Sequence, residues 1–583
     1  MDTWREAPIY CERGAAPAWT ETLASIAQTH APDDVYNEVR RIRRRGHARF
    51  RRPALCRQAP PRFACISIRL EGQPMPEPKR EFELKLDLTG KDLDRLVRNP
   101  KLRSTAGASQ KTLKSIYYDT PDYRLHTKGI SLRVRDDGQR YVQTVKLNGK
   151  LLNGLSNPVE IEDVLDDAKP DPARIHNRRV RRKVEKAIGG SALTQAFETV
   201  VTRTTRRLRT GGSVVELALD KGSTLAMNRK TEICEAELEL IKGNPKDLLL
   251  TAQSLFAKSG VRLSPASKAE RGYRLLLKKR PARRAKPVHA RAPDIGKDQT
   301  CGEAFAQILN AAREQIVENR TVVLDTDDPE GAHQLRVGLT RLRSAHRALK
   351  ALVDTPQMRQ LETDAQTISR AVGRLRDADV LIGEIVAPLA GGEPRRPGFD
   401  TLFKALQAHR EAMQKEAREA LAGEAWSRLL LSMTLGPSIL ESEPSLQYPV
   451  KAYASVALQK RWKNAAKLGR SIGGLEGERL HKMRKSLKKL RYTVEFLAPL
   501  YSKAKVKCFV KQLKKLQNIF GYVNDVRMAG QIRDICMAHC PNDPEALIAA
   551  GEVLGHHEAM SAELWKTAPS AWRRLKATGL YWK

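Results

Sequence analysis

The sequence contains no apolar stretch of the roughly 18 residues that a membrane-spanning helix needs, so we expect no membrane span. It also lacks an N-terminal basic segment followed by an apolar core, so we expect no secretory signal and a cytoplasmic protein. Its eight cysteines are scattered rather than grouped as a disulfide framework or as paired zinc ligands. Aromatic residues make up only 5% of the chain, and no nucleic-acid reader motif accompanies them, which argues against specific nucleic-acid binding.

Lysine is absent from the first 78 residues, which hold 13 arginines. This segment runs through Pro-rich and Arg-rich patches without hydrophobic periodicity. Two interpretations stay open. Residues 1–78 form a disordered basic tail, or translation starts at Met75 and the preceding segment is a misassigned extension.

Both larger parts of the chain are strongly basic. The formal net charge of +37 divides into +4 for residues 1–78, +17 for 79–280 and +16 for 281–583. Such a field favours polyanions, namely phosphate chains, nucleic acid or anionic lipid, without choosing among them. Prolines and basic residues over 280–298 indicate an exposed linker. We therefore expect one domain over 79–279 and a second over 299–583.

The first expected domain is rich in strands, because polar and apolar residues alternate along it. So many consecutive antiparallel strands favour a closed or nearly closed barrel, since closure removes exposed edges. Helices are expected at 90–98, 171–189, 245–259 and 267–279. Strands are expected at 81–88, 112–118, 129–135, 140–147, 156–163, 199–209, 213–220, 223–229 and 231–242.

Charge gathers on one face of strand after strand. Glu81, Glu83 and Lys85 share a face of the first strand, and Asp220 and Glu235 belong to similar faces of late strands. Either these faces point to solvent around an apolar centre, or the barrel is inverted and the charges line a hydrated tunnel. Carboxylates in a tunnel can hold Mg²⁺ or Mn²⁺ through oxygen, while nearby cations neutralise phosphate. The structural alternative for each cation is a salt bridge to a tunnel carboxylate.

These residues resemble the CYTH family, the triphosphate tunnel metalloenzymes. The resemblance covers roughly 79–278 and includes the Glu-x-Glu-x-Lys signature at 81–85, Tyr117–Thr120, the Arg133-x-Arg135 strand and Ser267–Tyr273. It implies an α+β fold with an antiparallel eight-stranded tunnel and flanking helices. It also implies a metal-dependent hydrolase acting on inorganic triphosphate or short polyphosphate. Thiamine triphosphatases and adenylate cyclases belong to the same family, so these activities stay open as alternatives.

The resemblance implies a role for each charged residue. Lys85 is the candidate catalytic cation, together with Glu81 and Glu83. The candidate phosphate-binding residues are Arg133, Arg135, Lys146, Arg203, Arg206 and Lys268. The candidate ligands for Mg²⁺ or Mn²⁺ are Glu81, Glu83, Glu160, Glu162, Asp220, Glu235, Glu237 and Glu239.

The rest of the chain is helical in period and contains an internal repeat. The pattern His-x-Leu/Met-Arg-x-x-Leu-x-Arg/Lys-Leu-Arg begins at His333 and again at His481, 148 positions later. The same offset relates Gly373 to Gly521 and Asp377 to Asp525. A single basic helix face is usually solvated. Two equivalent copies, related by pseudo-twofold packing, would instead set two cationic helices toward one groove.

This half resembles the CHAD domain, a helical module often fused to CYTH domains. The resemblance covers about 299–583 and implies an all-α bundle of two repeats that binds inorganic polyphosphate without a cofactor. His333 and His481 would make that binding pH-dependent, or they are buried hydrogen-bonding residues. The candidate polyphosphate-binding residues are His333, Arg336, Arg343, Arg347, Arg374, Arg376, His481, Arg484, Lys488 and Arg491.

Three classes of function follow from the sequence. The first is a triphosphatase whose helical domain tethers polyphosphate, in a cytoplasmic protein associated with polyphosphate granules. The second is a non-catalytic polyphosphate-binding protein of such granules, and the third is a nucleic-acid-binding protein, suggested by charge alone. The Glu81, Glu83 and Lys85 signature favours the first.

Overall fold

The computed structural model describes residues 82–99, 102, 109–136, 138–147, 155–156, 159–256, 262–264, 266–277, 285–350, 352–391 and 396–583. The two interpretations of residues 1–78, and the roles expected for Glu81, lie outside this description. The described residues form two compact units, 82–277 and 285–583. Within them, no helix is long and apolar enough to cross a membrane.

The first unit is built on an antiparallel sheet of ten described strands. Eight of them have five or more residues, in agreement with the expected eight-stranded tunnel, and the other two have two residues each. The strands are β1 (Glu83–Asp87), β2 (Ser109–Asp119), β3 (Ile130–Asp136), β4 (Tyr141–Leu147), β5 (Leu155–Ser156), β6 (Val159–Leu165), β7 (Thr194–Thr210), β8 (Ser213–Ala226), β9 (Arg229–Lys242) and β10 (Arg262–Leu263).

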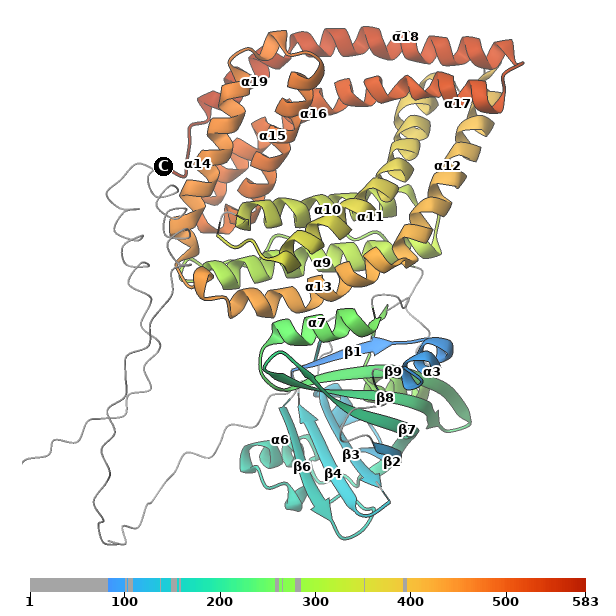
Figure 1. Cartoon of the computed structure of the whole chain (residues 1–583), viewed down its shortest axis with the longest axis vertical. Helices are drawn as coiled ribbons and strands as arrows, with labels where there is room; N and C mark the ends of the chain where they lie inside the picture. The colour runs from blue at the N-terminus through green and yellow to red at the C-terminus, as the bar shows by residue number, and fades with distance from the viewer. Residues whose placement is uncertain are drawn as a thin grey trace, which may run out of the picture. The chain divides into compact units, whose positions relative to one another are not determined.

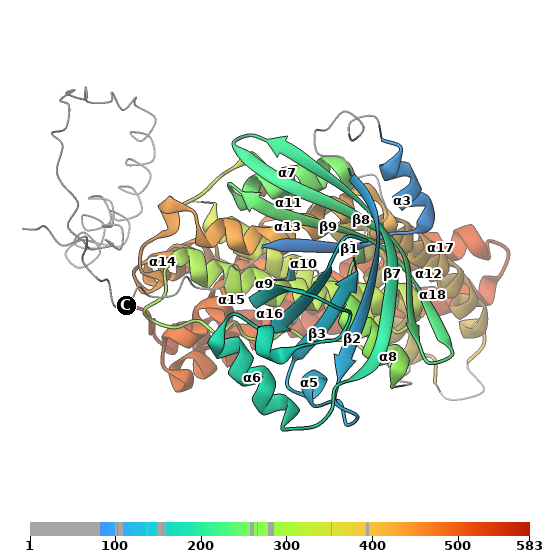
Figure 2. The ribbon, with the colours of Figure 1, turned by 90° about the horizontal axis from the view of Figure 1, so that it is seen from below.

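The two ends of the sheet approach each other through the two-residue strand β5. The strand order is β10-β1-β9-β8-β7-β2-β3-β4-β6, and β5, which lies just before β6 in the chain, pairs with β1. Figure 2 shows the strands curving round with helices on the outside. Those helices are α3 (Gly90–Val97), α5 (Arg124–Thr127), η1 (Pro172–Arg174), α6 (Arg178–Ile188), α7 (Pro245–Phe256) and α8 (Lys268–Leu276).

The expectation of separate strands at 213–220 and 223–229 was wrong, because β8 runs unbroken from Ser213 to Ala226 and the chain turns only at residues 227–228. Gly222, which lies between the two expected strands, pairs with β7 and β9 as a regular ladder residue. A Cβ at this position would meet the Val200 carbonyl oxygen at 2.1 Å. The glycine therefore permits a close approach of two strands rather than a turn.

Apolar side chains face outward from the barrel and are covered by helices. Leu132 and Val145 of neighbouring strands cluster with Val180 and Val184 of α6. On the other side, α7 contacts β7, β8 and β9, whose alternate leucines such as Leu238 are fully buried. The opposite faces carry the charged residues. The inverted barrel, with charge inside, is thus the correct interpretation of the alternation.

The second unit is all helical. Its first half contains α9 (Cys301–Asp325), α10 (Pro329–Leu349), α11 (Pro356–Val380), the π-helical η2 (Leu381–Val386), η3 (Ala387–Leu389), α12 (Phe399–Ala422) and α13 (Glu424–Glu441). After η4 (Pro444–Leu446), its second half contains α14 (Val450–Gly469), η5 (Ile472–Gly474), α15 (Gly477–Leu497), η6 (Ala498–Leu500), α16 (Lys503–Ala529), α17 (Gln531–His539), α18 (Pro544–Lys566) and α19 (Ala568–Ala577).

The two halves repeat one arrangement of helices. In the first, α10 packs against α9 and α11; in the second, α15 packs against α14 and α16. The halves meet where α10 contacts α15, and again where α12 contacts α17 and α18 (Figure 1). The chain before α9 joins this unit, because the Asn319 side chain hydrogen-bonds the backbone of Val288.

Candidate functional site

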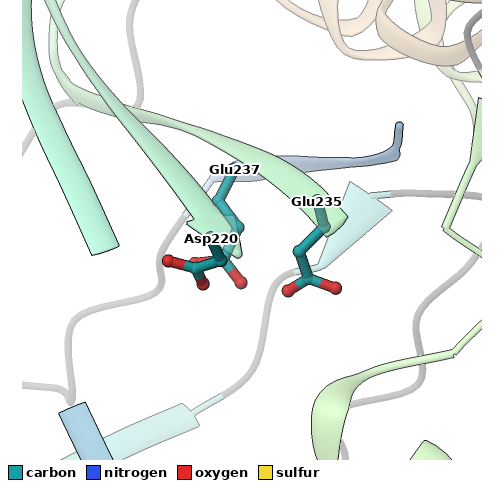
Figure 3. Close-up of side chains that lie close together, drawn as sticks. All are labelled: Asp220, Glu235 and Glu237. Carbon is teal, nitrogen blue, oxygen red and sulfur yellow. The ribbon is translucent and has the colours of Figure 1, made fainter. Parts of the chain in front are cut away.

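Three carboxylates from neighbouring strands converge inside the barrel. Asp220 on β8 and Glu235 and Glu237 on β9 each bring one oxygen within 4.8 Å of the others, and Figure 3 shows the three side chains close together. Asp220 is 0% exposed and Glu235 is 1% exposed. Buried carboxylates this close together need cations to balance their charge.

Strand register explains why these side chains meet. Asp220 lies directly opposite Glu235 in the β8–β9 ladder, and Glu235 lies opposite Asp87 of β1. In the neighbouring row, Glu237 lies opposite Lys85. Because directly opposite residues of an antiparallel ladder are close neighbours, the alternation of each strand becomes a row of facing charges.

Lys268 places its ammonium among the three carboxylates. Its Nζ lies 2.7 Å from Asp220 Oδ2 and 2.9 Å from Glu237 Oε1. It also contacts Glu235 Oε1. A compact cation shared by three carboxylates offsets part of the cost of burying them.

Helix α8 determines where Lys268 lies. The helix begins at this residue, because the Ser267 hydroxyl caps it by accepting a hydrogen bond from the Glu270 amide. It packs tightly on β7, since a Cβ at Gly272 would meet the Phe197 ring at 2.0 Å. Only glycine allows this approach, so the motif from Ser267 onward sets the distance between Lys268 and the carboxylates.

The Tyr117–Thr120 motif supports this arrangement structurally. Asp119 is 1% exposed and accepts hydrogen bonds from the amides of Thr120, Leu125 and His126. It also accepts one from the Tyr273 hydroxyl of α8, at 2.7 Å. A single buried carboxylate thus holds both the turn after β2 and the helix that carries Lys268.

Two further cations bind the same carboxylates from other strands. Arg203 of β7 donates to both oxygens of Asp220, at 2.8 and 2.7 Å, and to Glu237 Oε2 at 2.5 Å. Lys85 of β1 lies 2.5 Å from Glu237 Oε1 and also pairs with Glu83. Three cations therefore share Glu237, and the ionic network joins β1, β7, β8, β9 and α8.

The pKa values of the network reflect this pairing. Burial alone would lower the pKa of Lys85, but Glu237 and Glu83 raise it above its usual range. Neighbouring carboxylates raise the pKa of Lys268 against the same effect of burial. Burial also raises the pKa of Glu235. Burial would raise the pKa of Glu237 as well, but Lys268 and Lys85 hold it well below its usual range.

Arg271 joins the site although the sequence assigned it no role. It donates to Ser264 Oγ at 2.7 Å, pairs with Asp87 and lies 3.1 Å from Glu235 Oε2. It follows Lys268 by three residues and so lies on the same side of α8. Helical periodicity within the Ser267–Tyr273 motif was the signal that could have identified it.

A cavity of about 200 Å³ lies beside Arg203 within the barrel. Four of its nine lining residues are basic and none is aromatic. Lys111 and Arg140 were absent from the sequence-based assignment, because nothing in the strand pattern distinguished them from surface cations. The lining residues are Ser109, Lys111, Leu113, Arg135, Arg140, Val142, Glu162, Arg203 and Thr205.

A second group of charges lies on β3, β4 and β6. Arg133 Nη2 is 3.5 Å from Glu160 Oε1, and Lys146 pairs with the other oxygen of Glu160. The Thr144 hydroxyl is 3.2 Å from Glu162 Oε1.

Arg135 has the least compensated charge of this group. Neighbouring Arg133 and burial lower the pKa of Arg135 to about 10. The Nε atoms of both arginines are buried without a hydrogen-bond partner among the described residues. This part of the barrel thus holds an excess of positive charge.

Other expected ligands lie apart from the three converging carboxylates. Glu239 lies opposite Glu83 in the β1–β9 ladder. Glu160 and Glu162 belong to β6, with the partners described above. Arg206 lies on the opposite face of β7 from Arg203, because residues three apart in a strand point to opposite sides. Its guanidinium donates to the carbonyl oxygens of Leu102 and Thr205.

In the helical unit, cations of the two repeats come together. The pKa of Lys488 is lowered to about 7 by burial and by nearby Arg484, Arg336 and Arg491. Arg336 belongs to α10 and the other three to α15. These four residues, here called the cation cluster, come from both copies of the repeated motif.

The acidic residues of the motif face the same cluster. Arg336 pairs with Asp377 and donates to the Gly373 carbonyl at 3.1 Å. In the second copy, burial lowers the pKa of Arg484 although Asp525 opposes this shift. A Cβ at Gly521 would meet no atom within 4 Å, so that glycine borders open space.

The other expected polyphosphate-binding residues have varied surroundings. Arg347, Arg374 and Arg376 form ion pairs with Glu362, Glu416 and Glu384 respectively. Burial lowers the pKa of Arg343. Burial and neighbouring cations lower the pKa values of His333 and His481, whose rings have no hydrogen-bond partner among the described residues.

Comparison with known proteins adds independent findings. The CYTH domain model matches residues 79–273 and the CHAD domain model matches residues 307–534. An inorganic triphosphatase from Haemophilus influenzae is 32% identical over 164 residues, which are 28% of this chain and 46% of that protein. The chain thus spans about half the length of this curated relative.

Two solved structures are also similar. The CHAD domain from the plant Ricinus communis is 29% identical with a TM-score of 0.45, covering 50% of this chain and 97% of that one. A putative adenylyl cyclase from Hippeastrum, with a dominant triphosphatase activity, is 22% identical with a TM-score of 0.26, covering 32% and 92%. On the family models, the chain carries a CYTH domain followed by a CHAD domain.

Proposed function

We propose that this protein is a metal-dependent triphosphatase that hydrolyses inorganic triphosphate or short polyphosphate in its barrel, while its helical domain binds inorganic polyphosphate. The observation that carries the first part is the convergence of Asp220, Glu235 and Glu237 beside a cation-lined cavity. The CYTH match and the similarity to an inorganic triphosphatase support the same activity.

The donor atoms of this site fit a divalent metal. Asp220, Glu235 and Glu237 offer only oxygen, which Mg²⁺ and Mn²⁺ prefer. Oε2 of Glu235 has no hydrogen bond from the described residues, although Arg271 lies nearby. These three carboxylates would hold the metal. When bound, Mg²⁺ or Mn²⁺ would neutralise phosphate charge and lower the pKa of a coordinated water.

The cations of the barrel would bind and orient the phosphate chain. Arg135 and Arg203 line the cavity from two strands and present guanidiniums suited to phosphate oxygens. Lys85, whose raised pKa keeps it protonated, would stabilise charge on the oxygen that bridges to the leaving group. Positioned cations of this kind act most strongly in a buried site, where water screens them little.

Inorganic triphosphate is favoured over nucleoside or thiamine triphosphates by the cavity lining. Recognition of a base or thiamine ring usually uses aromatic or apolar surfaces, and no aromatic side chain lines the described cavity. Four basic residues there match the high charge density of a bare phosphate chain.

The helical domain offers polyphosphate a surface that is already positive. Arg484 and Lys488 have lowered pKa values because burial and nearby cations disfavour their charged forms. A bound polyanion would relieve this repulsion. The space beside Gly521 would allow a phosphate chain to approach the helix backbone.

The test of the triphosphatase measures phosphate release from triphosphate, ATP and thiamine triphosphate with Mg²⁺ or Mn²⁺. We expect triphosphate to be the best substrate and Glu237→Gln to reduce its turnover by about 100-fold or more. Glu232→Gln is the matched control, because Glu232 is exposed and lies on the opposite face of β9. Equal turnover in the two variants would remove the barrel assignment.

The polyphosphate assignment needs a separate measurement. Arg336→Ala combined with Arg484→Ala should weaken polyphosphate binding by the full chain, because it removes one cation from each repeat. Arg533→Ala, an exposed arginine paired with Asp534 on α17, is the control. Unchanged affinity in the double variant would contradict the assignment.

A further inference from the structure

The first half of α16 is unusually rich in positive charge. It has no acidic residue before Asp525. None of its lysines forms an ion pair with an acidic side chain in the described part of the chain. The six lysines, all exposed, are Lys503, Lys505, Lys507, Lys511, Lys514 and Lys515.

Four of these lysines lie on one side of the helix. Lys503, Lys507, Lys511 and Lys514 follow one another at intervals of four, four and three residues, which places them on one face. At a rise of 1.5 Å per residue, this lysine stripe is about 16 Å long. The side chains thus form a continuous track rather than scattered surface charges.

Helix stability does not explain this arrangement. Like charges three or four residues apart repel each other and destabilise a helix. Lys503 and Lys507 also lie near the N-terminus of α16, where the helix dipole favours acidic residues over basic ones. An anion bound along the stripe would remove both unfavourable effects.

The first repeat lacks an equivalent of the stripe. The first half of α11 carries Arg359, Glu362 and Asp364, a mixture of both signs. Glu362 pairs with Arg347, and Asp364 pairs with Arg428 of α13. Charges at this place in the first copy therefore join helices together, whereas those of the second copy face solvent.

The stripe continues the face of α16 that meets the cation cluster. Gly521 follows Lys514 by seven residues, and Asp525 follows Gly521 by four. These spacings place both residues on the same side of the helix as the stripe. Asp525 is a neighbour of Arg484 and Lys488. One helix face thus leads from the cluster to the exposed lysines.

We infer that the lysine stripe is a second anion-binding surface, on which a polyphosphate chain held at the cation cluster continues along α16. This inference rests on the proposed binding of polyphosphate by the helical domain and adds a site to it. Ammonium groups are compact point charges that suit a flexible chain of repeated phosphates.

A phosphate chain fits the stripe better than nucleic acid does. Binding of single strands relies on aromatic side chains that stack on bases. The aromatic residues of α16 nearest the stripe, Phe509 and Phe520, are both fully buried. The stripe therefore offers charge without a stacking surface.

The test compares polyphosphate fractions of two lengths on the full chain. Lys→Gln substitution at all four stripe positions should weaken binding of a long-chain fraction by about tenfold, because attachment at a second site is lost. Binding of a fraction too short to extend beyond the cation cluster should not change. The salt dependence of long-chain binding should also become shallower, since fewer cations contact the chain.

The control variant changes the same number of exposed lysines elsewhere, with Lys→Gln at 404, 415, 576 and 583. Equal loss of long-chain affinity in both variants would show that binding depends on total charge and not on the stripe, and would overturn the inference. Equal loss of duplex DNA and polyphosphate binding in the stripe variant would also overturn it. A melting temperature that does not fall shows that the stripe variant folds.

Failure of the proposed function would look different. A wild-type chain that binds neither polyphosphate fraction would overturn polyphosphate binding itself, together with the stripe. Binding of both fractions that weakens in the Arg336→Ala, Arg484→Ala variant but not in the stripe variant would preserve the proposed function and overturn only the stripe.

Discussion

The barrel and the helical unit treat buried positive charge in opposite ways. In the barrel, Lys85 and Lys268 contact carboxylates at short range, and these contacts raise their pKa values despite burial. In the helical unit, Arg484 and Lys488 lie close to other cations, and their pKa values are lowered. Both arrangements bury cations, but contacts with carboxylates outweigh the effect of burial only in the first.

This difference bears on how each surface would meet an anion. Paired cations stabilise the folded barrel, so a phosphate that binds them must compete with existing carboxylates or share the cations with them. Clustered cations destabilise the folded helical unit in the absence of an anion, so a bound polyanion adds stability. An anion entering the barrel would thus have to compete with carboxylates, whereas an anion at the helical unit would bind cations that repel each other.

The test with the largest expected effect replaces a buried lysine by methionine, first in the barrel and then in the helical unit. Lys268→Met should lower the free energy of unfolding of the barrel by about 3–5 kcal/mol, because it leaves buried carboxylates without their shared cation. Chemical denaturation of the full chain would measure this loss. Lys91→Met, at an exposed position on α3, is the control and should change little. A Lys268→Met barrel as stable as wild type would contradict the ionic network.

The same change in the helical unit should have the opposite sign. Lys488→Met should raise the free energy of unfolding by on the order of 1 kcal/mol at pH 6, because it removes a charge that burial and nearby cations disfavour. Calorimetry at this pH would measure the gain. Destabilisation by Lys488→Met would show that Lys488 is balanced by anionic groups, as in the barrel.

Lys488 should also make polyphosphate binding depend on pH. Its folded-state pKa of about 7 lies below the unfolded value, so the protonated form dominates only below about pH 7. Affinity should therefore fall about two- to fivefold between pH 6 and pH 8 as Lys488 loses its proton. Titration calorimetry of wild type and Lys488→Arg would measure this. A wild-type pH profile unchanged by the arginine would assign the dependence to His333 or His481 instead.

The linked effect on stability has a defined sign. The folded state holds the Lys488 proton less tightly than the unfolded state does. The destabilisation of the fold by the charged Lys488 is therefore fully present below pH 7. Stability without a ligand should therefore rise as the pH increases from about 7 toward the ordinary lysine pKa of about 10.4. Denaturation across this range, with Lys488→Met as reference, isolates the contribution of this residue.

A pair of glycine substitutions gives the smallest expected effect. Gly521→Ala should stabilise α16 by about 0.5–1 kcal/mol, because alanine is the better helix former, and should weaken polyphosphate binding by filling the open space. Gly551→Ala in α18 also meets no atom within 4 Å and should give the same stabilisation without affecting binding. Equal polyphosphate affinity in both variants would show that the space beside Gly521 is not used.

Alternation and repetition made much of the fold predictable. The period of two placed Asp220 and Glu235 on charged strand faces, and the offset of 148 residues identified two related helical halves. Alternation alone did not say which face lay inside. Only packing of the apolar faces on α6 and α7 settled that question.

Long-range contacts explain what the sequence missed. Arg203 and Arg206 belong to one run of basic residues, and only the register of β7 separates the one that binds Asp220 from the one that binds backbone carbonyls. Gly222 lies inside one strand where two were expected, and the reason for a glycine there, the close approach of Val200 across the sheet, cannot be seen in the local sequence. Arg271 acquires its role from Asp87 and Glu235, which are distant in the sequence.

The ammonium of Lys268 has a consequence for how the barrel folds. Many small metal sites are unfolded until their ion arrives, because nothing else balances the ligands. Here a covalently attached cation already lies between Asp220 and Glu237. On the proposed metal-dependent function, the barrel would fold before its metal binds, and chelators should remove the activity reversibly while leaving the melting temperature nearly unchanged.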